Sequence, residues 1–106
     1  MQEYVLQKNT EKALIKSNLI HWSQFVQCTG VCPYRLSELV EIGWVEAVRI
    51  SSDNFHFPER EIFRVQKLMR ICRDFELPTI GGAIIVDLLE RIEGLEKEIA
   101  QLRNLI

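Results

Sequence analysis

The chain has 106 residues, of which 47% are hydrophobic and 26% charged, a composition typical of a folded domain rather than a disordered chain. The formal net charge of −2 gives no overall attraction to nucleic-acid phosphates, since nucleic-acid modules usually carry a basic surplus. The longest clean apolar run, Ala83 to Val86, is far too short to span a membrane, and the three cysteines lack a disulfide-framework spacing. We therefore expect a cytoplasmic protein made of one small domain with at most an appended helix.

The first 19 residues contain two short apolar runs, Tyr4 to Leu6 and Ala13 to Ile15, separated by polar residues around Asn9. Short apolar runs bounded by polar turn residues are typical of a hairpin. We expect an N-terminal arm or a pair of short strands over residues 1–19.

A helix-turn-helix follows. Residues 23–28 predict one or two helical turns that place Phe25 toward a core, and Gly30 supplies the tight turn. Pro33 is suited to the first position of a second helix over residues 33–42, which ends at Gly43. The outward side of this helix is expected to hold Tyr34, Arg35, Ser37, Glu38 and Glu41.

The next segment predicts a wing and a long helix. Residues 44–48 indicate a strand, residues 51–54 a turn and residues 55–57 a returning strand that Pro58 stops. A helix over residues 59–75 carries a basic stripe, formed by Arg60, Arg64, Lys67, Arg70 and Arg73. The stripe is interpreted as a solvated face or as pairing with acidic residues of a second subunit, with nucleic-acid binding as the alternative.

A final helix begins near Thr79 or Ile80. Its apolar residues alternate in steps of three and four, as in the seam of a coiled coil: Ile85, Leu88, Ile92, Leu95, Ile99, Leu102 and Ile106. A seam of about 22 residues is roughly 33 Å long, too long to be buried against so small a head. Residues from about 84 to 106 are therefore expected to form a homodimer, the alternative being a plain core helix.

These elements divide the chain into an arm (1–19), a winged helix-turn-helix domain (20–78) and a dimerisation helix (79–106). The expected fold is mainly α, with a small β wing and a C-terminal coiled-coil helix. The order of elements resembles the MerR-type winged-helix fold. The resemblance is closer still to its CbpM-type chaperone-modulator branch, whose motif is matched by Phe25, Thr29, Gly30, Val31, Leu36, Leu39, Val40, Gly43, Val45 and Glu46.

The resemblance implies a partner. Proteins of the CbpM type bind and inhibit a DnaJ-like co-chaperone called curved-DNA-binding protein A, whose J-domain carries a basic second helix. In the DNA-binding branch the second helix and wing carry basic residues, whereas here they carry Glu38, Glu41 and, just beyond, Glu46. The expected J-domain contact is made by Tyr34, Arg35, Glu38, Glu41 and Glu46, with help from Asp87 and Glu90.

Alternative interpretations stay open at this point. Surface carboxylates are usually only solvated. A MerR-type transcriptional regulator is the second functional hypothesis, and an adaptor for an unrelated partner is the third. The DNA-binding residues of a regulator would be Arg35, Arg49, His56, Arg60 and Arg64.

No arrangement of nucleophile, base and orienting group is visible, so we expect no enzyme and no cofactor. Cys28, Cys32 and Cys72 with only His21 and His56 do not make a recognisable zinc spacing, so no metal site is expected. Cys32, at a helix start, is a minor redox candidate.

Overall fold

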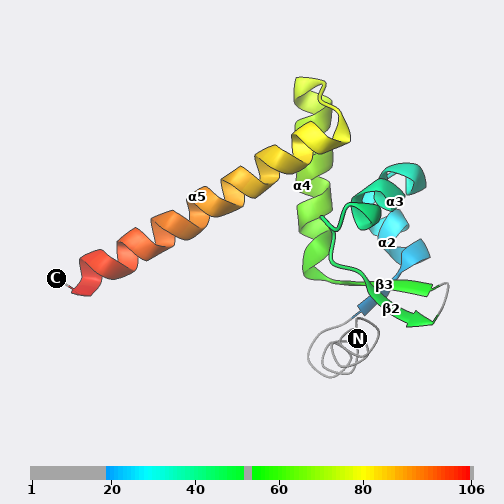
Figure 1. The fold of residues 1–106 in the computed structure, drawn as a ribbon, viewed down its shortest axis with the longest axis horizontal. Helices are drawn as coiled ribbons and strands as arrows, with labels where there is room; N and C mark the ends of the chain where they lie inside the picture. Colours follow the sequence, from blue (N-terminus) through cyan, green and yellow to red (C-terminus); the bar gives the residue numbers. More distant parts are fainter. Residues whose placement is uncertain (1–18, 52–53, 106) are drawn as a thin grey trace.

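The computed structural model describes residues 19–51 and 54–105. Its elements in chain order are β1 (Leu19–His21), α2 (Trp22–Thr29), α3 (Pro33–Glu41), β2 (Val48–Ser51), β3 (Asn54–Pro58), α4 (Arg60–Phe75) and α5 (Thr79–Leu105). The mainly helical fold with a small wing is thus confirmed (Figure 1). The predicted arm falls outside the described residues except for its last residue, Leu19, which begins β1.

The helix-turn-helix forms as the sequence predicts. Helix α2 ends at Gly30, whose φ of 74° is left-handed and suits a residue without a Cβ. The Thr29 hydroxyl lies inside the turn, where it donates to the Phe25 carbonyl at 2.8 Å and accepts from the Val31 amide at 3.2 Å. Helix α3 then starts with Pro33 in its first turn. These bonds fix the angle at which α3 leaves α2.

The three strands form one antiparallel sheet in the order β1-β3-β2. The wing is confirmed, but the prediction of a strand over residues 44–48 is wrong, because β2 starts at Val48. The amides of Gly43, Trp44 and Val45 instead donate to carbonyls at the end of α3. These residues cap a helix, so the sheet begins later.

The core lies between α2, α3, the sheet and α4. Phe25 and Phe57 are fully buried and stack with ring centroids 4.3 Å apart, and Leu36 and Leu39 of α3 are fully buried beside them. Helix α4 runs alongside these elements and turns Val65 and Leu68 into the same core, with its long axis crossing that of α5 (Figure 1). The apolar stripe of α3 is therefore fixed inward, and its polar face is fixed outward.

Helix α5 has two distinct parts. Its first two turns pack on α4 through Gly82, Ala83 and Val86. Glu90 and Glu93 still reach side chains of α4, and the part beyond them extends away from the head as one continuous helix (Figure 1). Gly82 is needed there, because a Cβ would lie 2.3 Å from the sulfur of Cys72. The predicted start at Thr79 is confirmed.

The heptad residues from Ile85 to Leu102 lie on the free side of α5. At about 100° per residue they are on the side opposite Gly82, Ala83 and Val86, which face the head. Along this seam Leu88, Ile92, Leu95, Ile99 and Leu102 are between 43% and 61% exposed, and Ile85 is half-buried. Such a row of exposed aliphatic side chains has no cover within the described part of the chain.

Candidate functional site

The exposed face of α3 is the first feature of the site. Tyr34 is 79% exposed, Ser37, Glu38 and Glu41 are exposed beside it, and Arg35 is half-buried. The structure therefore brings four of the five residues expected on the partner face to one helix surface, with only Glu46 lying elsewhere. An exposed aromatic ring next to two carboxylates is suited to a partner that offers apolar contact and positive charge.

Glu46 follows α3 in the loop to β2 and is already paired. Its carboxylate accepts a hydrogen bond from the guanidinium of Arg60 on α4, and both side chains are exposed. The pair neutralises both residues at the surface. Glu46 is thus less available for a cationic partner than Glu38 and Glu41, and Arg60 is less available for phosphate.

Arg64 is the centre of a cluster that joins three parts of the chain. Its guanidinium donates to the Trp44 carbonyl at 3.0 Å, to Glu61 at 2.9 Å and to Glu90 of α5 at 2.9 Å. It also lies 4.0 Å from the centroid of the Trp44 ring, whose Nε1 donates to Asp87 at 2.8 Å. We call these five residues, Trp44, Glu61, Arg64, Asp87 and Glu90, the Arg64 cluster.

The charges of the cluster compensate one another. Burial raises the pKa of Glu61, and the neighbouring Arg64 opposes that rise. Burial alone would lower the pKa of Arg64, but its bonds to Glu90 and Glu61 outweigh burial and raise the pKa above its ordinary value. Arg64 is therefore a fixed cation that keeps a nearly buried carboxylate in place.

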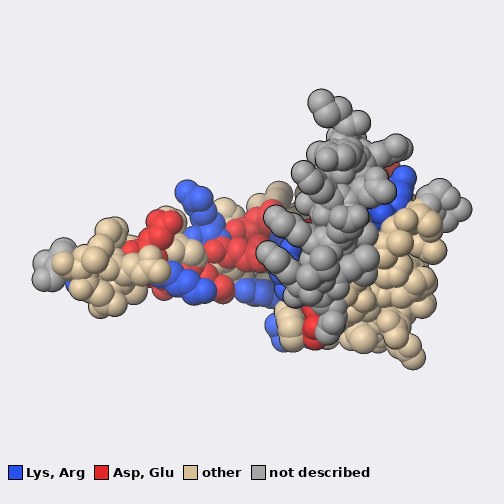
Figure 2. Space-filling model, turned by 90° about the horizontal axis from the view of Figure 1, so that it is seen from below, with Lys and Arg blue, Asp and Glu red and all other residues tan. Residues whose placement is uncertain are grey.

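The basic stripe of α4 is thus used within one chain. Arg64 bonds to Glu90, and Lys67 lies 3.4 Å from Glu93, both on α5 of the same molecule. These two residues are therefore not simply solvated, and pairing of the stripe with a second subunit stays a prediction. On the face shown in Figure 2, acidic and basic side chains lie next to each other along α5. Asp87 and Glu90, expected to help at a partner interface, belong to the Arg64 cluster instead.

The residues expected to bind DNA are mostly engaged. Arg60 and Arg64 are paired with carboxylates, Arg35 is half-buried, and Arg49 is exposed with its guanidinium 4.9 Å from the centroid of Phe55. His56 is half-buried. Its pKa is lowered mainly by burial and, to a smaller extent, by repulsion from the nearby His21. It is therefore neutral near pH 7. Of the five residues, Arg49 is exposed and pairs with no carboxylate among the residues that the structure describes.

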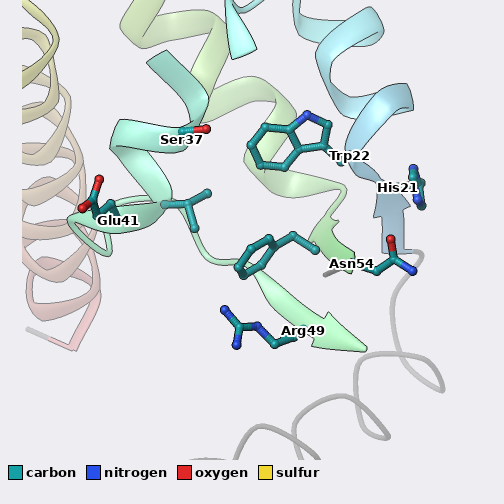
Figure 3. A pocket seen from close by; sticks show the side chains of 8 residues that line it. His21, Trp22, Ser37, Glu41, Arg49 and Asn54 are labelled. Atoms are coloured by element: carbon teal, nitrogen blue, oxygen red, sulfur yellow. The ribbon is translucent and has the colours of Figure 1, made fainter. Parts of the chain in front are cut away.

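A pocket of about 760 Å³ lies between α3 and the wing, and sequence reasoning missed it (Figure 3). Its apolar lining consists of Trp22, Val40 and Phe55, and Glu41 and Arg49 supply opposite charges. The remaining lining residues are His21, Ser37 and Asn54. The residues come from β1, α2, α3, β2 and β3, so no local sequence pattern could have revealed them together.

Cysteines and histidines form no metal centre in the described ranges, where no group of three or more His, Cys, Asp or Glu side chains is placed to hold an ion. Cys28 and Cys32 are exposed thiols, whereas Cys72 is buried. His21 and His56 pack edge to face at 5.1 Å, and the buried Nδ1 of His56 finds no hydrogen-bond partner among the residues described.

Among the helices in residues 19–51 and 54–105, none combines the length and apolar character needed to cross a membrane.

Comparison with known proteins agrees with this architecture. Residues 20–104 match the family described as MerR HTH family regulatory protein. The chain is also 31% identical over 80 residues to the chaperone modulatory protein CbpM of Salmonella arizonae, an alignment that covers 76% of this chain and 79% of the relative. With its helix-turn-helix, wing and long terminal helix, this chain belongs to the MerR HTH family and, within it, to the CbpM-type proteins.

Proposed function

We propose that this protein is a non-enzymatic chaperone modulator that binds the J-domain of a DnaJ-like co-chaperone and inhibits it. The observation that carries the proposal is the exposed face of α3, where Tyr34 lies beside Glu38 and Glu41. The name of the Salmonella relative, chaperone modulatory protein, supports the same role. Occupying the J-domain would keep it from its chaperone partner.

Charge complementarity supports a protein partner over DNA. Glu38 and Glu41 would repel a phosphate backbone, and Arg60 and Arg64 of α4 are already paired with carboxylates of the same chain. A basic helix of the kind found in J-domains offers the opposite charge. The α3 surface is therefore better suited to a cationic protein helix than to a duplex.

We also propose that the protein is a homodimer joined along the seam of α5. Five seam residues from Leu88 to Leu102 are about half exposed, and an apolar row of this length is suited to a second identical helix. The head packs on the other side of α5, so pairing along the seam would leave both α3 surfaces open.

The test is calorimetric titration of the protein with the isolated J-domain of the co-chaperone from the same organism. We expect micromolar or tighter binding, and its loss in the double variant Glu38→Lys/Glu41→Lys. The matched control is Glu59→Lys/Glu76→Lys, which changes the net charge equally at two exposed positions outside α3. A flat titration of the folded wild type would refute the proposal, and unchanged affinity of the α3 variant would remove α3 from the interface.

A DNA-binding regulator is the second candidate, because the family is described as regulatory and because Arg49 stays exposed on the wing. Such a protein would lose affinity for DNA steeply as salt rises, and Arg49→Ala would reduce the slope by about one counterion. Binding that is confined to the J-domain and absent with genomic DNA would reject this candidate.

A further inference from the structure

The pocket between α3 and the wing combines an apolar floor with charged sides. Trp22 lies with its ring centroid 6.5 Å from that of Phe55 and 5.7 Å from that of Phe57. Trp22, Phe55 and Val40 of α3 form the apolar lining, with the buried Phe57 beneath it, and Figure 3 shows the lining side chains around a common hollow. A partner surface that covered the pocket with polar groups alone would make no apolar contact with this lining.

The charges around the pocket are arranged with opposite signs on its two sides. Glu41 lies on α3, on the same helix face as Glu38, whereas Arg49 lies on β2 and rests on Phe55 (Figure 3). A cation of the occupant would be attracted toward α3 and repelled from the wing. The pocket therefore fixes both the chemistry and the orientation of what it accepts.

We propose that this pocket holds one bulky apolar side chain of the partner protein, with an adjacent basic side chain directed to Glu41. The inference rests on the proposed function and deepens it, because it assigns an anchor site beside the α3 face. Binding energy at protein interfaces is concentrated where an apolar anchor fills a pocket surrounded by polar contacts. The acidic residues then set orientation, and the pocket supplies most of the affinity.

A protein side chain is the occupant that the surroundings favour. The pocket is continuous with the exposed α3 face through Ser37 and Glu41, which line it and are themselves exposed. A small molecule is usually enclosed over most of its surface, whereas a side chain enters from a partner that covers the opening. Tyr34 on the same helix would then lie against the partner next to the anchor.

The test obstructs the pocket without touching the core. In Ser37→Trp the new indole would enter part of the space from an exposed helix position, and Gln24→Trp places the same ring at an exposed position of α2 outside the lining of this pocket. We expect Ser37→Trp to weaken J-domain binding at least tenfold in calorimetry and Gln24→Trp to change it less than twofold. Far-UV circular dichroism shows whether both variants are folded.

A second measurement locates the contact in the wild type. Trp22 lines the pocket, whereas Trp44 is held in the Arg64 cluster, so their indole N–H signals in an NMR spectrum report different regions. We expect the Trp22 signal to move in the saturated J-domain complex and Glu41→Gln to reduce affinity at least threefold. If the wild type binds while the Trp22 signal stays in place and Ser37→Trp binds normally, the pocket is not the anchor site and the proposed function survives. If the folded wild type does not bind the J-domain, both proposals fail.

Discussion

Replacing Arg64 by Met should separate the electrostatic part of the Arg64 cluster from its packing. Met keeps a long apolar stem of similar reach but removes every donor of the guanidinium. The Trp44 carbonyl and the carboxylate of Glu61 then lose their bonds, and Glu90 loses its link to α4. Because the Glu61 side chain is only 3% exposed, water cannot replace its lost partner at low cost.

The size of the expected loss of unfolding free energy depends on how deeply the ion pair is buried. Removing one partner of a buried ion pair costs about 3–5 kcal/mol, because an uncompensated charge is left inside. Arg64 is 23% exposed and Glu90 is accessible, so their ion pair is partly solvated. Loss of that pair therefore contributes little to the loss of unfolding free energy. We expect Arg64→Met to lower the free energy of unfolding by about 3 kcal/mol near neutral pH, at the low end of that range.

The loss of unfolding free energy in Arg64→Met should depend on pH, because Glu61 titrates. Its pKa is raised in the folded state, so its contribution is most favourable below its ordinary pKa of 4.5 and is lost as pH rises through the folded-state pKa. Without Arg64 that pKa rises further. The variant should therefore differ less from the wild type near pH 4.5 than near pH 7.5.

Urea unfolding at a fixed chain concentration, followed by circular dichroism at both pH values, measures this difference. Adding Glu61→Gln to Arg64→Met removes the stranded charge, and we expect it to recover at least half of the loss near neutral pH. A loss below about 0.5 kcal/mol for Arg64→Met at both pH values, within the range of ordinary surface substitutions, would show that the cluster does not stabilise the fold in this way. So would a double variant as unstable as the single one.

Three further outcomes are expected. Gly82→Ala should lower the free energy of unfolding by about 1–3 kcal/mol, because its Cβ would meet the Cys72 sulfur, while Gly81→Ala, with ordinary contacts of 3.7 Å, should be neutral or slightly stabilising in the same urea assay. The lowered pKa of His56 predicts that unfolding free energy falls as pH drops below its ordinary pKa of 6.5, and His56→Phe should remove that component between about pH 7 and 5.5. Leu95→Glu should convert a dimer to a monomer in sedimentation equilibrium, and an unchanged mass would exclude the α5 seam as the interface.

Local sequence patterns were sufficient to predict most of the fold. Gly30 and Pro33 indicated the turn and the second helix, and apolar spacing located α4 and the start of α5. Each of these signals depends on residues a few positions apart, which share one helix face or one turn. The exposed face of α3 was predictable for the same reason, because the buried Leu36 and Leu39 determine which side of that helix faces out.

Long-range contacts were not predictable in this way. Val45 and Val48 both suit a strand, but the backbone amides around Val45 donate to carbonyls at the end of α3. They are not free for a sheet, and β2 therefore begins only at Val48. The pairing of Arg64 with Glu90 joins residues 26 positions apart, which no helix or strand period connects. The pocket likewise depends on how α3 lies against the sheet, which is decided by the packing of the whole core rather than by any one segment.

The arrangement of α5, with the head on one side and the seam on the other, has a consequence for valency. Two copies joined along their seams would carry their heads on the outer sides of the pair, with both α3 faces available. Such a molecule would bind two partners at once, in a complex of two chains of each kind. Toward a co-chaperone that is itself a dimer, the second contact would be intramolecular and governed by effective concentration, so inhibition would be far stronger than one head alone could give.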